Sequence, residues 1–132
     1  MRLSKTEKHD FITDLREAFN RTLANVGVYD KYYTRDSLLN MAVCQPAKRF
    51  YTSIEEAKRC IYSIEKIGIT GKSNKLQQEK YNDIHRIYLR LKEIYPSFST
   101  NRLIELAIES PAPKFYITSY CANNVLNKNI KI

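Results

Sequence analysis

The sequence predicts an all-α protein made of two tandem three-helix units, each resembling a helix-turn-helix module, that pack through their two long helices. Three observations predict this architecture. Apolar residues recur at three- and four-residue steps in six segments. A serine or threonine stands before four of these segments, where a helix cap is expected. The stretch 42–53 is repeated in closely similar form at 107–118, which indicates an internal duplication.

A long helix is expected over residues 5–26, at the start of a first repeat that covers residues 1–67. Ser4 and Glu7 match a capping box, in which each side chain accepts a hydrogen bond from the other residue's backbone amide. Apolar side chains then recur at helical spacing as far as Gly27, and a glycine is a common helix end because it tolerates positive φ.

A short helix around 38–43 must end at Pro46, because proline has no amide hydrogen and restricts the conformation of the residue before it. The chain is then expected to run extended. A second capping box, Ser53 with Glu56, starts a third helix that ends at Gly68. We call the connection between the short and the third helix the elbow.

The segment 68–74, GITGKSN, has the composition of a linker, and a second repeat is predicted over 75–132. Three helices are expected there: 75–95, a shorter one that begins after Ser99 and ends at Pro111, and one over about 119–126. The two repeats therefore show the same order of long helix, short helix, elbow and closing helix. We expect them to form one compact globule.

An alignment of 34–61 with 99–126 pairs like residues through both elbows. The matched pairs include Pro46 with Pro111, Phe50 with Phe115, and Tyr51 with Tyr116. We interpret this likeness as a duplication. The alternative is that two segments of helix, proline, extended chain and helix converged on one packing solution.

In each elbow the phenylalanine is expected to enter the core while the next residue, a tyrosine, points the opposite way, because side chains alternate along an extended chain. One interpretation is purely structural, a fixed corner between helices. The other is that cations and phenols placed before a helix N-terminus bind phosphate. The candidate residues for nucleic acid or another partner are Lys48, Arg49, Tyr51, Lys58 and Arg59 in the first repeat and Lys114, Tyr116, Asn123, Asn124 and Lys128 in the second.

Charge and composition favour a binding protein. The net charge of +8 favours polyanionic partners, and ten tyrosines without tryptophan suit an interface. The turn of a usual helix-turn-helix has three or four residues, whereas about nine separate the helices here, so direct reading of a DNA groove is disfavoured. No catalytic motif, metal-ligand spacing or cofactor motif is present, and we expect a protein that is not an enzyme and has no cofactor.

The phrase A-x-x-x-P-A-x-[KR]-F-Y-x-[ST], at 42–53 and again at 107–118, resembles one in small proteins of tailed phages and mobile elements of gut Bacteroidetes. The second copy has Pro113 where the first has Lys48. This resemblance implies a phage or mobile-element setting, and it assigns no catalytic residue.

These observations lead to two expected functions. The first is a structural adaptor of a phage particle, associated with the capsid or portal, that meets protein partners and packaged DNA. The alternative is a DNA-binding regulator or small packaging subunit that uses the helix-turn-helix-like repeats. No membrane span or secretory signal is expected, so the predicted location is the virion or the host cytoplasm, and the oligomeric state is left open.

Overall fold

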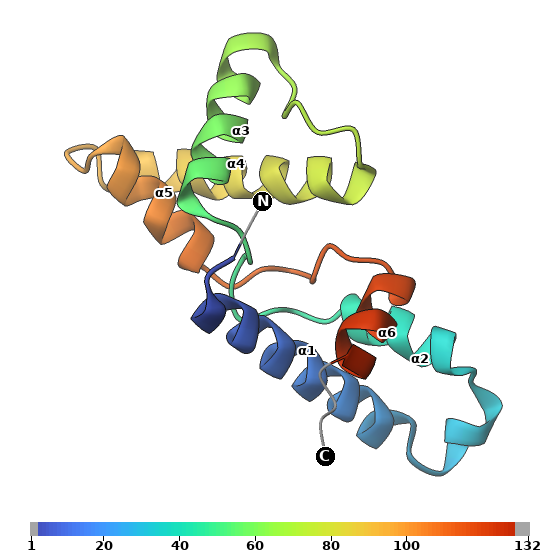
Figure 1. Ribbon diagram of the computed structural model, residues 1–132. Helices are drawn as coiled ribbons and strands as arrows, with labels where there is room; N and C mark the ends of the chain where they lie inside the picture. Colours follow the sequence, from blue (N-terminus) through green and yellow to red (C-terminus); the bar gives the residue numbers. More distant parts are fainter. Residues whose placement is uncertain (1–2, 129–132) are drawn as a thin grey trace. The chain divides into compact units, whose positions relative to one another are not determined.

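The computed structural model describes residues 3–128, and its regular structure there is entirely helical (Figure 1). The elements are α1 (Lys5–Val26), the 3₁₀ helix η1 (Gly27–Tyr32), α2 (Arg35–Val43), α3 (Ile54–Ile67), α4 (Lys75–Ile94), α5 (Thr100–Glu109) and α6 (Ser119–Lys128). The predicted all-α class is confirmed. Extended pairing within the described residues is limited to an isolated antiparallel bridge between Ala47 and Ala112.

Side-chain caps set the beginnings of the helices. Both halves of the capping box at Ser4 and Glu7 are present, as predicted. At α3, the Ser53 hydroxyl accepts from the Glu56 amide, but the Glu56 carboxylate binds other groups instead of returning to Ser53. The cap at Ser53 is thus an ordinary N-cap.

The helices form two compact units, which divide the chain differently from the predicted boundaries at 1–67 and 75–132. Unit 1 contains α3, α4 and α5 within Lys48–Pro111, and unit 2 combines Ser4–Ala47 with the chain from Ala112 onward and contains α1, α2 and α6. Each closing helix therefore packs against the long and short helices of the other repeat: α3 on α4 and α5, and α6 on α1 and α2.

The elbows explain this exchange. Each elbow, residues 45–53 or 110–118, runs without a helical turn, and an extended residue advances the chain by about 3.3 Å. Each elbow takes the chain out of the unit that holds its short helix and into the other unit. The predicted linker 68–74 is instead the loop between α3 and α4 inside unit 1. Within the units, α1 packs on α2 and α6, and α4 packs on α3 and α5. The packing of the two long helices against each other stays a prediction.

The backbone hydrogen bonds of the elbows repeat with the same shift of 65 residues as the sequence. The Phe50 amide donates to the Ile108 carbonyl, and the Phe115 amide donates to the Val43 carbonyl, each at 3.0 Å. Ala47 and Ala112 exchange amide-to-carbonyl bonds of 2.9 and 3.0 Å. Both phenylalanines are buried, as predicted.

Candidate functional site

The structure divides the ten predicted site residues equally between the units. In unit 1, Lys48, Lys58 and Arg59 are exposed, Arg49 is half-buried and Tyr51 is buried. In unit 2 the exposed residues are Asn124 and Lys128, the half-buried ones are Lys114 and Asn123, and Tyr116 is buried. The exposed candidates thus lie mainly on the closing helices.

Burial of the two elbow tyrosines corrects the expectation that they face a partner. Tyr51 is 7% exposed and Tyr116 is 3% exposed. A neighbouring cation helps to cover each tyrosine ring. The Arg49 guanidinium lies 5.9 Å from the centre of the Tyr51 ring, and the Lys114 ammonium lies 5.8 Å from the centre of the Tyr116 ring. Tyr116 also departs from the extended backbone on which the expectation rested, since its φ is 60°.

Asn123 also has a structural role. Its side-chain oxygen accepts a hydrogen bond of 2.7 Å from the Arg35 guanidinium, which lies 5.2 Å from the centre of the Phe19 ring. Arg35 therefore connects α2 with α6 and α1. This use of Asn123 within unit 2 leaves Asn124 and Lys128 as the exposed candidates on α6.

Unit 1 holds a buried polar cluster that the sequence analysis did not identify. Lys80 is 4% exposed, and its ammonium group donates a hydrogen bond of 2.6 Å to the Tyr51 carbonyl. Burial lowers the pKa of Lys80 to about 8, and the nearby charge of Lys72 acts in the same direction. Lys80 stands one helical turn before Ile84 on the buried stripe of α4, and this position is the sequence signal that would have revealed it.

The Glu56 carboxylate is the anionic member of this cluster. It accepts from the Lys72 ammonium at 2.6 Å and lies 3.5 Å from the Arg59 guanidinium. The hydrogen bond from Lys72 lowers the pKa of Glu56, and burial opposes that change. Lys72 comes from the 68–74 loop, so the ion pair fixes this loop to the beginning of α3.

Tyr81 and Thr52 complete the cluster with a hydrogen bond of 2.7 Å between their hydroxyl groups. Burial raises the pKa of Tyr81 to about 12. The ammonium groups of Lys72 and Lys80 lie 5.7 and 5.4 Å from the centre of its ring. These contacts join the elbow, α3, the loop and α4 into one packed structure.

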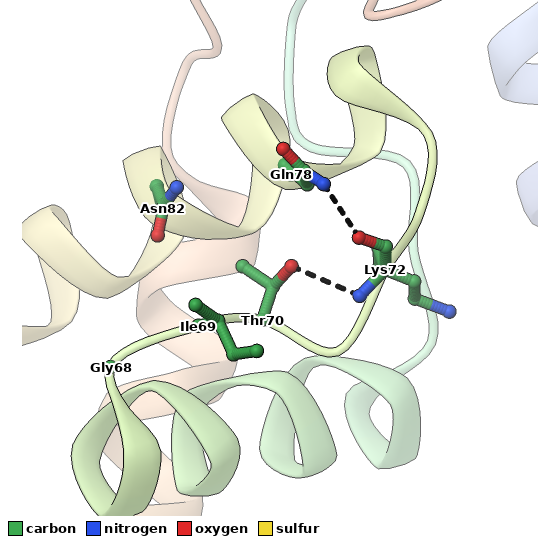
Figure 2. Close-up of a pocket in the computed structure, with 6 residues that line it drawn as sticks. All are labelled: Gly68, Ile69, Thr70, Lys72, Gln78 and Asn82. Carbon is green, nitrogen blue, oxygen red and sulfur yellow. Dashed lines mark hydrogen bonds between the residues drawn. The ribbon is translucent and has the colours of Figure 1, made fainter.

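A pocket of about 170 Å³ lies beside this loop (Figure 2). The Lys72 amide donates to the Thr70 hydroxyl at 3.1 Å, and the Lys72 carbonyl accepts from the Gln78 amide group at 2.7 Å. Figure 2 shows the Lys72 side chain extending away from the other labelled residues. The pocket is smaller than the roughly 300–1,000 Å³ typical of ligand sites, and its polar loop groups already bind one another.

Both units expose apolar side chains where the long helix ends and the chain turns toward the short helix. We call these two surfaces the corners. The corner of unit 2 consists of Leu23, Val28, Tyr29 and Tyr32, and the corner of unit 1 consists of Leu89, Ile94, Tyr95 and Phe98. Their exposed fractions are 36–80% and 40–59%, respectively.

The corners match residue by residue at a shift of 66, which also places four of the five buried residues of α1 on buried residues of α4. The fifth, Val26, corresponds to exposed Lys92. Each corner carries a pair of rings three residues apart. The ring centres of Tyr29 and Tyr32 are 6.4 Å apart, and those of Tyr95 and Phe98 are 4.7 Å apart. The corners thus share composition, exposure and ring pairing.

The positions between the corner residues do not match. Ala24 corresponds to Arg90, and Asp30 corresponds to Pro96. Sequence reasoning missed the corners because the alignment of the repeats began at residue 34, after Tyr32. Extending the alignment into the long helices with a one-residue gap after Tyr32 would have found them.

None of the helices in the described part of the chain is both long enough and apolar enough to span a membrane. Within residues 3–128, no group of three or more histidine, cysteine, aspartate or glutamate side chains is placed to hold a metal ion. Comparison of the chain with protein-family models, with curated proteins and with solved structures found no match.

Proposed function

We propose that the protein is a non-enzymatic adaptor that binds protein partners through two like helical units. The observation that carries this proposal is the recurrence of four exposed apolar residues at corresponding positions of both units. A buried apolar residue recurs because the core needs it, but an exposed one has no such packing requirement. Grouped exposed apolar side chains are typical of protein interaction sites.

The proposal includes a duplication as the origin of the two units. It is supported by the matched corners, by the elbow hydrogen bonds that repeat at a shift of 65, and by the equivalent burial of Phe50 and Phe115. A duplicated binding surface lets one chain hold two copies of a partner, or two partners of like chemistry, and such linkage strengthens overall binding.

The setting in a phage particle rests on the resemblance of the repeated phrase at 42–53 and 107–118. We place the adaptor at the capsid or portal, so that it resides in the virion or in the host cytoplasm. Its excess of basic residues suits proximity to packaged DNA, since unit 1 has twelve basic and eight acidic residues within Lys48–Pro111.

Capture experiments with corner variants test the adaptor. The immobilised protein is exposed to an extract of the cells or particles that contain it. The variant Tyr29→Ser, Tyr32→Ser removes one ring pair, and Tyr95→Ser, Phe98→Ser removes the other. A partner that binds the adaptor is retained less by either variant and is lost when all four substitutions are combined.

A matched control separates the corners from exposed tyrosines in general. Tyr62 and Tyr120 are 63% and 72% exposed, and the residues that correspond to them in the other repeat are Asn127 and Glu55, which are polar. The variant Tyr62→Ser, Tyr120→Ser is expected to capture the partner as well as the original protein. Undiminished capture by the four-substitution variant would contradict the proposed function.

DNA binding is the second candidate, and the exposure of Lys48, Lys58 and Arg59 favours it. Titration with duplex DNA at two salt concentrations tests this candidate. If these three cations bind phosphates, the affinity falls about 40-fold between about 50 and about 200 mM salt. The variant Lys58→Ala, Arg59→Ala weakens binding and reduces this salt dependence. The absence of binding at the lower salt concentration removes the DNA-binding candidate and leaves the adaptor.

A further inference from the structure

We propose that two copies of this chain form a domain-swapped dimer by trading α6, with Tyr116 as the hinge. In the dimer, α6 of each copy packs on α1 and α2 of the other copy. The inference concerns unit 2 alone, and it depends neither on the adaptor function nor on the corners.

The backbone of Tyr116 is strained. Its φ of 60° lies in the left-handed region, where the Cβ atom of any residue other than glycine comes too close to the following carbonyl oxygen. This conformation is disfavoured by about tenfold. Tyr51, the corresponding residue of the first elbow, does not adopt it. The strain therefore comes from the path of the second elbow and not from the residues that the two elbows share.

The strained residue lies in a hinge of two residues, Tyr116 and Ile117. Before the hinge, Phe115 is buried, and its amide donates a hydrogen bond of 3.0 Å to a carbonyl of α2. After the hinge, the Thr118 hydroxyl accepts a hydrogen bond from a backbone amide of α6. Between these two fixed points the chain turns at Tyr116, and α6 packs on α1 and α2 of its own copy. Release of the strain straightens this turn and directs α6 away from them.

The surface that holds α6 identifies a second copy as the partner. Ala122 and Leu126 of α6 are buried there, and the Ser119 hydroxyl donates a hydrogen bond of 2.6 Å to the Asp36 carboxylate. Every copy of the chain carries the same helix, so α6 of a second copy can make the same contacts. A swapped dimer thus retains the packing of α6, and reciprocal swapping closes the assembly at two copies.

Because the contacts of α6 are the same in both states, the hinges and the protein concentration decide between them. A short tether gives α6 an effective concentration on the order of 1 mM at its own copy, so an unstrained hinge gives a dimer dissociation constant of about 1 mM. Release of strain at two hinges, by about tenfold each, lowers this constant by about 100-fold, to about 10 µM.

Matched substitutions at Tyr116 test the hinge by sedimentation velocity over about 1 to about 500 µM protein. Tyr116→Ala and Tyr116→Gly both remove the ring, but glycine alone adopts positive φ without strain. We expect Tyr116→Ala to dimerise like the original protein and Tyr116→Gly to dimerise about 100-fold more weakly. Tyr51→Ala and Tyr51→Gly are the same pair at a residue without positive φ, and their dimer dissociation constants should agree with each other.

Cross-linking between two different variants tests whether α6 is the swapped element. One chain carries Asp36→Cys and the other carries Ser119→Cys, and in both Cys44→Ser and Cys121→Ser remove the exposed thiols of the described residues. When the two are mixed above the dissociation constant, a short bifunctional maleimide should join one chain to the other, because the swapped dimer places these two positions side by side. A dilute chain with both substitutions should be cross-linked internally, which shows that the reagent spans the distance.

Three results would overturn the inference. A monomeric original protein over the whole concentration range shows that α6 stays on its own copy. Equal dimerisation of Tyr116→Ala and Tyr116→Gly removes Tyr116 as the hinge. A dimeric sample without cross-links between chains shows that the copies associate elsewhere. Circular dichroism checks that each variant keeps its helices, and if the alanine or glycine variant does not fold, cross-linking decides, since it leaves Tyr116 unchanged.

Discussion

Replacement of the buried Lys80 by methionine should change how the stability of the protein depends on pH. Lys80 is almost fully buried, and its ammonium donates to the Tyr51 carbonyl at 2.6 Å. Methionine keeps the apolar part of the side chain and removes the charge. The Tyr51 carbonyl loses this hydrogen bond, which lowers the free energy of unfolding of the variant by an amount that does not vary with pH. The difference in pH dependence between the variant and the original protein therefore reports the charge of Lys80.

The pKa of Lys80 gives the sign and size of the effect. Its pKa is lowered from 10.5 to about 8 in the folded protein, so the unfolded chain binds more protons between these values. The free energy of unfolding therefore rises with pH across this window. From the linkage relation, the rise is roughly 1 kcal/mol between pH 7 and pH 9 and roughly 2 kcal/mol by pH 10. The pKa of Tyr81 is raised from 10.0 to about 12, so this residue makes the free energy of unfolding fall as the pH rises above 10.0. The rise due to Lys80 is therefore measured below pH 10.

Chemical denaturation at several pH values between 7 and 10 measures this rise. The Lys80→Met variant should lack it, whereas Lys58→Met, a control at an exposed position of α3, should retain the slope of the original protein. Equal slopes for the original protein and Lys80→Met would refute the reasoning, because the pH dependence would then arise from another group.

Three further predictions concern the packing of the units. Phe50→Ala and Phe115→Ala should each lower the free energy of unfolding by about 3–5 kcal/mol in denaturant titrations, because each leaves a cavity; a negligible loss at either would contradict its place in the core. Lys72→Met should destabilise the protein at pH 7 and progressively less as the pH falls below 4.5, because the lowered pKa of Glu56 stabilises the fold above its ordinary value of 4.5 and this contribution is lost as the pH falls through the folded pKa; a loss that stays the same down to the acid limit of folding would speak against the ion pair. Cleavage at a protease site inserted after Ser73 should leave the two fragments bound together in gel filtration, since each unit contains helices from both sides of the cut; separate elution would show that the closing helices are not exchanged.

The beginnings of three helices followed from the sequence because they depend on groups within four residues of each other, whereas α2 begins at Arg35, earlier than the expected 38. Ser4, Ser53 and Ser99 each cap the helix predicted to follow them. The burial of Phe50 and Phe115 was also predictable, since an aromatic residue in a short extended segment between two helices has a core within reach. The burial of the tyrosine beside each phenylalanine was not, because it depends on a second packed surface.

The sequence by itself determined the helical class, the caps and the likeness of the two elbows, because helical periodicity and capping act over a few neighbouring residues. The tertiary structure alone decided that α3 belongs with α4 and α5 and that α6 belongs with α1 and α2. The apolar stripe of a closing helix indicates that the helix packs against other helices, but it does not identify those helices. The exposure of the corner residues was likewise decided by the fold, since the sequence pattern alone does not show which apolar residues remain uncovered.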